Sequence, residues 1–382
     1  MSVSELGWFL SWAGMMTGSI CRWGFLSTAA IARKNWKAIR LSGNGRVSAV
    51  ASRSSAKAQA FIDECAAEVP PAGEVAAVGS YEELIERDDV DAIYIPLPTG
   101  LRKQWVLAAA KAGKHVLCEK PVAINLQDAQ EMVDACAEAG VQFMDGVMFD
   151  HSKRLEEVCR SLQSGEAVGK LRRINCHFSF SGDDSFQQSN IRTDSVLEPH
   201  GCLGDLGWYC IRMTLWAAGL KLPTHLSART ITGLAGKDSD GEVPGEFSAE
   251  LQFEGGLSAA FYCSFLTNNQ QTVLLSGDEG YLAVDDFVLP FYDAEASWVE
   301  NRHVLEIDNC RWNFRRHRNC KAIAEYSCGE PNASEVNMVR RLGQCVVENQ
   351  LDPRYPDLTI KTQRILDACR RSDAAGGAQV SI

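Results

Sequence analysis

Apolar and polar positions alternate in blocks over the first third of the chain, from about Arg22 onward. Short apolar runs are separated by amphipathic stretches, and after the first of them the runs lie at 46–52, 92–95, 115–118 and 141–144. Short strands separated by helices are typical of a parallel sheet with helices on both faces. The pattern predicts an α/β fold with a doubly wound parallel sheet over residues 21–149.

The pattern changes from Leu171 onward. Strand-like runs now follow one another with short turns between many of them, at 171–180, 249–253, 257–265, 272–277 and 280–284. Consecutive strands without intervening helices indicate a mostly antiparallel sheet. We expect a C-terminal α+β domain over 150–382 with an open-faced sheet. Amphipathic stretches at 334–348 and 358–371 predict two helices, the second packing back on the first domain.

The first 20 residues are apolar and aromatic, and Glu5 is their only charge. They lack the basic start of a secretory signal and the arginines of a transit peptide. The stretch is also too short to span a bilayer comfortably. We expect an N-terminal extension over 1–20 rather than a targeting signal, and no membrane association.

Composition narrows the class of protein. At 382 residues and 46% hydrophobic content, the chain can form two cores. Its net charge of −11 argues against a nucleic-acid surface, which needs a basic patch. The 14 cysteines are scattered without a CxxC pair, and most lie in apolar runs, where cysteine behaves as a small hydrophobe. We expect reduced thiols in the cytoplasm and no metal site.

The turn after the first strand resembles a dinucleotide-binding turn, as in a Rossmann-type fold. The fingerprint G-x-G-x-x-G/A would fall on Ser27, Ala29 and Ala32, so both leading glycines are replaced. A helix N-terminus still favours phosphate, although the added Cβ atoms narrow the approach of a pyrophosphate. By itself the turn is a weak motif. Its candidate cofactor contacts are Ser27, Thr28, Ala29 and Ile31.

The end of the second strand bears on the choice of cofactor. An acidic residue there accepts a ribose hydroxyl, whereas an arginine accommodates a 2′-phosphate. This chain has Ser52-Arg53-Ser54 with Lys57 one turn later, a set suited to a phosphate dianion. We therefore predict NADP rather than NAD. The alternative is an ordinary exposed arginine at a strand end.

Two further motifs carry candidate chemistry. Glu119-Lys120-Pro121 follows the strand 115–118, and the proline holds Lys120 extended at the end of the strand where α/β sheets place their sites. Asp205 and Tyr209 are four residues apart on an expected helix, so their side chains face the same way. A carboxylate and a phenol so placed can exchange a proton. The alternatives are a solvated turn, and a helix cap with a core tyrosine.

Taken together, these motifs resemble the Gfo/Idh/MocA oxidoreductase family, and within it the branch of dihydrodiol and D-xylose dehydrogenases. The resemblance rests on Arg53, Pro96-Leu97-Pro98, Glu119-Lys120-Pro121 and Asp205-x-Gly207-x-Tyr209. It implies a nicotinamide cofactor contacted by Pro96, Leu97, Glu119 and Lys120. It further implies a homodimer or larger homo-oligomer through the C-terminal sheet.

The same resemblance assigns roles. Lys120 lies by the nicotinamide and the substrate hydroxyl, Tyr209 donates or accepts the proton, and Asp205 orients the substrate. Hydride transfer leaves a proton to move, and a phenol can carry it if its pKa is lowered, which we expect the Lys120 ammonium to do. The chain departs from the family pattern at Arg102. It departs again at Asp150, because the family commonly has arginine at that position.

Two functions remain open at this point. The first is an NADP-dependent dehydrogenase acting on a sugar or vicinal diol. The second is a catalytically silent NADP sensor or scaffold, motivated by the missing glycines and by Arg102. The intact set of Lys120, Asp205 and Tyr209 favours the enzyme.

Overall fold

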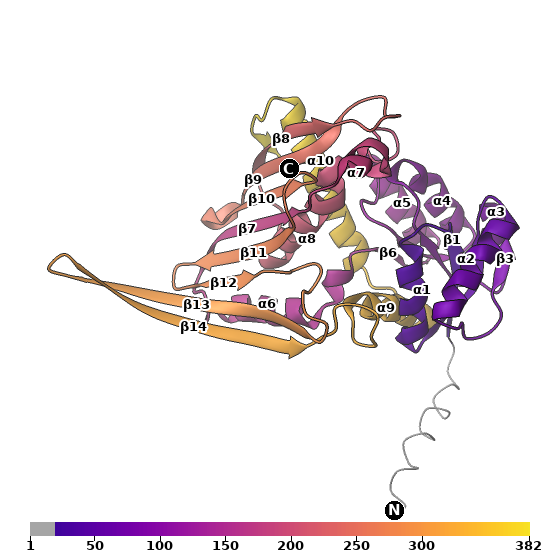
Figure 1. Cartoon of the computed structure of the whole chain (residues 1–382), viewed down its shortest axis with the longest axis horizontal. Coiled ribbons are helices and arrows are strands. Elements are labelled where there is room, and N and C mark those ends of the chain that lie inside the picture. The colour runs from indigo at the N-terminus through magenta and orange to yellow at the C-terminus, as the bar shows by residue number, and fades with distance from the viewer. Residues whose placement is uncertain (1–19) are drawn as a thin grey trace, which may run out of the picture.

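The computed structural model describes residues 20–382, so the extension expected over 1–20 lies outside the described residues except for Ile20. A first sheet has six parallel strands in the order β3-β2-β1-β4-β5-β6 (Figure 1). Chain order reverses between β1 and β4, which is where such sheets open a ligand crevice. The strands are β1 (Cys21–Leu26), β2 (Gly45–Ala51), β3 (Ala76–Val78), β4 (Ala92–Ile95), β5 (His115–Cys118) and β6 (Phe143–Asp145). The predicted doubly wound fold is confirmed.

Local sequence explains these elements. All four residues of β4 are buried, as expected for a parallel strand covered on both faces. Helix α2 begins after Ser54, whose hydroxyl accepts the Lys57 N–H at 3.3 Å, and α5 begins after Asn125, which caps it in the same way. The helices between the strands are α1 (Ala32–Ser42), α2 (Ser55–Glu68), α3 (Tyr81–Ile85), α4 (Thr99–Lys111) and α5 (Leu126–Glu138).

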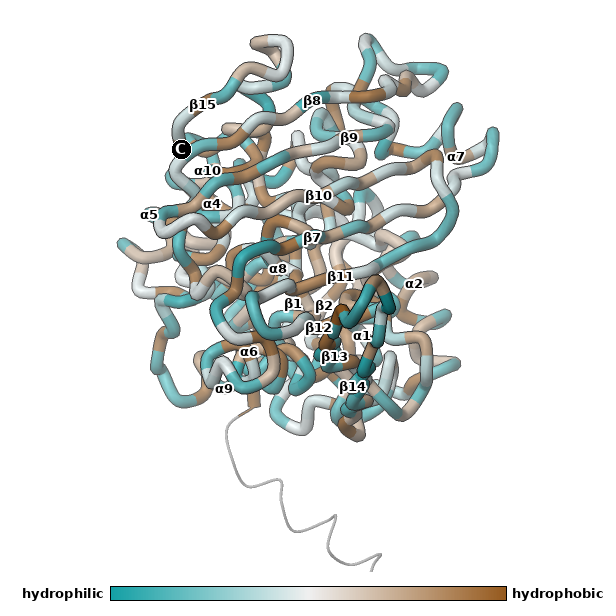
Figure 2. Tube along the Cα trace, turned by 90° about the vertical axis from the view of Figure 1, so that its left-hand side faces the viewer, coloured by the Kyte–Doolittle hydropathy of each residue, from teal (hydrophilic) through white to brown (hydrophobic). Residues whose placement is uncertain are grey.

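A second sheet has nine strands in the order β14-β13-β12-β11-β7-β10-β9-β8-β15, and Figure 2 shows its open face. Neighbours are antiparallel except β7 and β10, which are parallel. This agrees with the expected mostly antiparallel sheet. The strands are β7 (Leu171–Ser179), β8 (His225–Leu234), β9 (Val243–Gln252), β10 (Ser258–Ser264), β11 (Gln270–Gly277), β12 (Tyr281–Val284), β13 (Glu295–Asp308), β14 (Arg311–Ala324) and β15 (Val380–Ser381).

The hydrophobic pattern misses several of these strands. It gives no strand at β3, β8, β13 or β14, and it starts β9 at Ala249 rather than Val243. Almost every residue of β14 is exposed, so no buried face imposes an alternation on its sequence. Such strands are held by pairing with a neighbour, and pairing leaves little trace in a single sequence.

The helices of the C-terminal half connect the two sheets. Helix α10 contacts α5 and β6 on one side and α8 and β8 on the other. Its Asp367 carboxylate accepts the Leu126 N–H at the start of α5 at 2.6 Å. The helices are α6 (Lys153–Ser164), α7 (Asp184–Ser189), a π-helical turn (Leu203–Gly207), α8 (Trp208–Ala217), α9 (Ser334–Glu348) and α10 (Arg354–Ala374), with 3₁₀ turns at Met148–His151, Ile191–Thr193 and Glu254–Gly256.

A buried ion cluster fixes α8 against the first sheet. The Arg212 guanidinium is fully buried, lies 2.6 Å from Asp145 at the end of β6, and pairs with Asp150 as well. Its Nε donates to Thr362 of α10 at 2.9 Å. Burial raises the pKa of Asp150 to about 6 although Arg212 opposes the shift. Charges this deeply buried are tolerated because each one has partners.

No helix among residues 20–382 is long and apolar enough to cross a bilayer.

Replacing Arg212 with methionine is expected to destabilise the fold by about 3–5 kcal/mol, because Asp145 and Asp150 lose their common cation in a dry site. Urea unfolding followed by circular dichroism measures the change. The matched control is Arg173→Met, whose pair with Glu250 is partly exposed and should contribute roughly 1 kcal/mol or less. Equal losses in the two variants would contradict the assignment.

Candidate active site

Three strands of the first sheet end at one cavity. Beyond β1 comes the turn at Ser27, beyond β4 comes Pro96, and beyond β5 comes Glu119. Because the strands are parallel, their carboxyl ends lie along one edge of the sheet. A cavity of about 430 Å³ lies there, closed from the other side by residues of the C-terminal half that include Arg192, Asp205 and Tyr209. The cavity lies within the usual size of a small-molecule site.

Lys120 and Asp205 form an ion pair within this cavity. The Lys120 ammonium lies 2.6 Å from Asp205 Oδ1 and also donates to the Asp205 backbone oxygen at 2.7 Å. Both side chains are largely buried, with exposed fractions of 10% and 14%. Lys120 lies two residues beyond β5 and Asp205 lies in the π-helical turn before α8, so the pair joins two parts of the chain that are far apart in sequence. The Lys120–Pro121 peptide bond is cis.

A second cation binds the same carboxylate. Arg192, in the 3₁₀ turn Ile191–Thr193, places its Nε 2.9 Å from Asp205 Oδ2. Burial alone would raise the pKa of Asp205, but Lys120 and Arg192 together lower it to about 2. Asp205 is therefore a fixed negative charge at neutral pH, held in one orientation by two cations.

Tyr209 lies beside this pair. The Lys120 ammonium is 4.8 Å from the centre of the Tyr209 ring, and Phe149 and Phe178 pack against the same ring at 6.0 and 5.7 Å between centroids. The ring is thus fixed by packing, and it lines the cavity. The π-helical turn at Asp205 replaces the regular helix that the sequence predicts there, yet both side chains still line one cavity.

The expected effect of Lys120 on Tyr209 is wrong. The pKa of Tyr209 is raised well above its ordinary value, by burial first and then by the Glu119 and Asp205 carboxylates, while Arg192 opposes the shift. Lys120 is paired with Asp205, so the Asp205 carboxylate largely offsets the effect of the ammonium charge on the phenol. The spacing of residues in the sequence cannot predict this shift, because it shows neither the burial of the ring nor the carboxylates that lie near it in the folded chain.

Glu119 and Arg102 also line the cavity. Tyr94 donates its hydroxyl to Glu119 Oε1 at 2.6 Å. Arg102 is buried, donates to the Leu97 carbonyl at 2.6 Å and to that of Pro121, and lies 3.8 Å from Glu198. Arg102 therefore fastens the loop after β4 to the loop after β5, which gives this departure from the family pattern a structural role.

The turn at Ser27 has the backbone of a glycine turn without the glycine. Ser27 has a φ of 131°, a region that residues with a Cβ rarely adopt. No side chain caps the start of α1 just beyond it, where Ala29, Ala30 and Ile31 line the cavity. Uncapped N–H groups at a helix start suit a pyrophosphate, so the site fits a dinucleotide. Thr28 is half-buried within the same turn.

The residues predicted to bind a 2′-phosphate lie apart from the cavity lining. Arg53 and Lys57 are exposed, and no ion pair to a carboxylate is found for either among residues 20–382. Ser52 is buried, and its backbone N–H donates to the Val78 carbonyl at 3.1 Å. The exposed cations just beyond β2 are accessible to a phosphate, whereas the buried Ser52 side chain has little accessible surface with which to contact one.

Sequence reasoning missed Arg192, Glu198 and Lys34 as cavity residues. Arg192 and Glu198 come from a segment whose sequence carries no motif, and Lys34 lies on α1 just beyond the predicted dinucleotide turn. Their position follows from the packing of the two halves of the chain.

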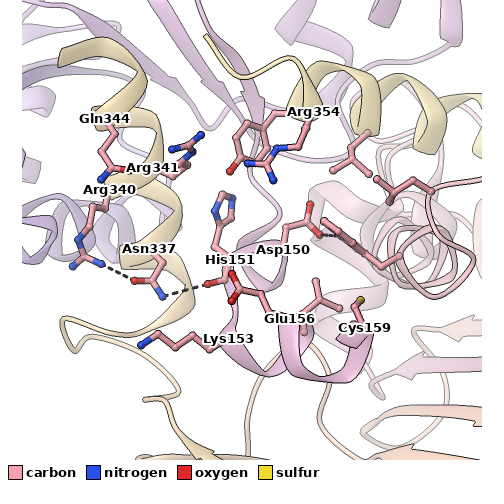
Figure 3. A pocket seen from close by; sticks show the side chains of 15 residues that line it. Asp150, His151, Lys153, Glu156, Cys159, Asn337, Arg340, Arg341, Gln344 and Arg354 are labelled. Carbon is pink, nitrogen blue, oxygen red and sulfur yellow. Dashed lines mark hydrogen bonds between the residues drawn. The ribbon is translucent and has the colours of Figure 1, made fainter. Parts of the chain in front are cut away.

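A second cavity, of about 540 Å³, lies between α6, α9 and α10 (Figure 3). Three of the arginines that line it already have partners. Arg341 and Arg354 share Asp352, each at 2.7 Å, and Arg340 donates to the Ser42 carbonyl at the end of α1. This cavity holds none of the predicted site residues.

Comparison with protein families gives two adjacent matches. An oxidoreductase family with an NAD-binding Rossmann fold matches residues 21–147, and the GFO/IDH/MocA C-terminal domain matches residues 157–283. Together they cover more than half of the chain.

Curated relatives are similar over most of their length. D-xylose 1-dehydrogenase (NADP(+)) 2 of Haloferax volcanii is 32% identical over 296 residues, which is 77% of this chain and 85% of that protein. Trans-1,2-dihydrobenzene-1,2-diol dehydrogenase of Sus scrofa is 30% identical over 69% of this chain and 74% of its own length. A dTDP-3,4-didehydro-2,6-dideoxy-alpha-D-glucose 3-reductase of Streptomyces violaceoruber is 34% identical over 69% of this chain and 72% of its own length.

Solved structures share the fold. A 3-ketoreductase from Actinomadura kijaniata, solved with NADP and TDP-benzene, has a TM-score of 0.75 at 24% identity over 93% of this chain and 98% of that one. Levoglucosan dehydrogenase, in complex with NADH and levoglucosan, has the same TM-score at 16% identity over 95% of this chain and 100% of that one. The two family matches and the curated relatives show that the chain belongs to the Gfo/Idh/MocA family of oxidoreductases.

Proposed function

We propose that the protein is an NADP-dependent dehydrogenase that transfers hydride between nicotinamide and the hydroxyl-bearing carbon of a sugar or vicinal diol. The observation that carries the proposal is the meeting of Lys120, Asp205 and Tyr209 in one cavity at the edge of the first sheet. Relatives at 30% identity or more include a D-xylose dehydrogenase and a trans-dihydrodiol dehydrogenase, which supports this substrate class.

The residues divide the work as follows. A bound nicotinamide supplies or accepts the hydride. Tyr209 moves the proton at its hydroxyl, since its ring is fixed beside the cavity by two phenylalanines. Its raised pKa keeps the hydroxyl protonated at neutral pH, so Tyr209 starts as the proton donor when a carbonyl substrate is reduced.

Lys120 holds the substrate oxygen next to Tyr209. An ammonium has three donors, and two of those of Lys120 go to Asp205, which leaves one for a substrate oxygen. Asp205 orients the ammonium and presents its remaining lone pairs to a substrate hydroxyl. Arg192 keeps that carboxylate in place from the other side.

The cofactor choice rests on Arg53 and Lys57. Both are exposed beyond β2, at the position that distinguishes the two nicotinamide cofactors, and the chain has no acidic residue there to bind a free ribose hydroxyl. The NADP named in the Haloferax volcanii relative supports the same choice.

The open face of the second sheet is the proposed site of self-association. No helix of the described part of the chain, residues 20–382, covers the face shown in Figure 2. The sheet exposes Leu274 on β11 and Ile231 on β8 among polar side chains. A sheet face of this mixed character can pair with its own copy in a two-fold dimer.

A silent cofactor-binding protein is the second candidate, and the strained turn at Ser27 favours it. The two are separated by a panel of aldoses, trans-diols and keto sugars assayed with NADP⁺ or NADPH. NADPH binding without turnover of any of them would support the silent protein.

Lys120→Met and Tyr209→Phe are each expected to lower turnover by roughly 10²–10⁴-fold, because each removes a group that contacts the reacting oxygen. NADPH binding, measured by quenching of its fluorescence, should remain within a few-fold of the wild type. Lys103→Met and Tyr262→Phe are matched controls, since both residues lie outside the cavity lining. Near-normal turnover in both site variants would sink the proposed roles.

Arg53→Ala is expected to weaken NADPH binding by about tenfold or more, because a charge-assisted hydrogen bond contributes about 1.5–3 kcal/mol. NADH binding should change little, since it carries no 2′-phosphate. Arg160→Ala, at an exposed site on α6, serves as the control. An equal loss of affinity for NADPH and NADH would contradict the assignment of Arg53 to the 2′-phosphate site.

Ser27→Gly is expected to stabilise the fold by about 1 kcal/mol and to tighten NADPH binding several-fold, because glycine adopts a φ of 131° without strain and clears the turn. Thermal unfolding and fluorescence titration measure the two effects. Ser27→Ala keeps the Cβ and should give neither gain. A Ser27→Gly variant that binds NADPH no better than the wild type would place the pyrophosphate elsewhere.

A further inference from the structure

The hairpin of β13 and β14 projects from the body of the molecule as a long ribbon, which we call the arm (Figure 1). Its strands pair continuously from Glu295 with Ala324 to Asp308 with Arg311. Strand β12 pairs with β13 only as far as Asn301, so the distal part of the arm has no neighbour in the sheet. Seven residues of extended strand lie beyond that point, and they reach roughly 24 Å.

The arm ends in a tight turn. Asn309 and Cys310 have φ values of 45° and 66°, the left-handed pair of a two-residue type I′ turn. This turn matches the twist of the flanking strands. The arm is therefore a regular ribbon, extended in one direction by its own backbone pairing.

One face of the distal arm is apolar. Leu305 pairs with Phe314 and Ile307 pairs with Trp312, and alternation places all four side chains on the same face. They are exposed by 41% for Leu305, 61% for Ile307, and 65% each for Trp312 and Phe314. The opposite face is polar, with Glu306 and Arg315 paired across the strands.

Such a face needs a cover. A two-stranded ribbon is marginally stable in water by itself, and an exposed apolar strand pair is a site of association. Covering these side chains removes several hundred Å² per arm, and two exchanged arms approach the roughly 1,600 Å² of a standard interface. Within residues 20–382 the body of the same chain offers no cover, because the distal arm points away from it.

The charge of the arm indicates what covers it. Residues 295–324 contain six Lys or Arg and four Asp or Glu, a net charge of +2 in a chain of net charge −11. The remaining residues therefore carry −13. A cationic arm and an acidic body attract each other between two copies of one chain.

We propose that the arm of each chain packs its apolar face onto the acidic body of a second copy, so that the arms are exchanged in a homo-oligomer. The contact is isologous, since one chain gives its arm and receives the arm of the other. This interaction is separate from pairing through the open sheet face, because it uses the distal arm, which lies beyond the last pairing of β13 with β12.

The test is the oligomeric state of the purified full chain by sedimentation velocity over a range of concentrations. The wild type is expected to sediment as two or more chains. The double variant Trp312→Ser with Phe314→Ser should raise the dissociation constant of the assembly at least tenfold. Raised salt concentration should also weaken the wild-type assembly. The control is Asn313→Ser with His317→Ser, on the polar face of the same strand, which should leave the assembly unchanged.

A second variant guards against a local effect of the serines. Replacing residues 303–316 with Asn-Gly closes the hairpin between Arg302 and His317, which already pair, and removes the apolar face entirely. This variant should form assemblies with the same number of chains as the double serine variant. Its thermal unfolding midpoint should equal that of the wild type. A monomeric wild type would mean that the arm serves another partner. That result, or an assembly unchanged by either arm variant, overturns the proposal.

Discussion

The ion pair between Lys120 and Asp205 is the interaction on which the site depends. Lys120 comes from the end of a strand in the first sheet and Asp205 from the turn before α8, and their side chains meet at 2.6 Å. Each is largely buried, so neither charge would be stable there without the other. The pair therefore fixes the distance between the two halves of the chain at the point where a substrate would bind.

Helix α8 is held at two places, and this makes Tyr209 a rigid group. At its start, Asp205 is bound by Lys120 and Arg192. One turn after Tyr209, Arg212 is locked between Asp145 and Asp150. A side chain on a helix fixed at both sides keeps its geometry, which the proton-transfer role proposed for Tyr209 requires.

The departures from the family pattern fall into two kinds. Arg102 has a structural role, since it joins the loops after β4 and β5 through backbone carbonyls. Asp150 likewise has a partner in Arg212, and its side chain is only 3% exposed. Ser27 is different, because its backbone keeps the conformation of a glycine and no contact explains the added side chain.

The sequence alone determined the α/β architecture and the elements that end at the site. Alternating apolar runs and helical stretches need no partner to be recognised, because burial on both faces imposes them, as in the fully buried β4. The motif Glu119-Lys120-Pro121 and the spacing of Asp205 and Tyr209 were equally visible. The tertiary structure decided what those residues experience. Arg192 binds Asp205, and burial of Tyr209, together with the Glu119 and Asp205 carboxylates, raises its pKa, which is opposite to the shift expected. The tertiary structure also decided the arm, whose strands face solvent and are defined by pairing with each other. Local pattern records which side chains are buried, whereas electrostatics and strand pairing depend on neighbours that only the folded chain brings together.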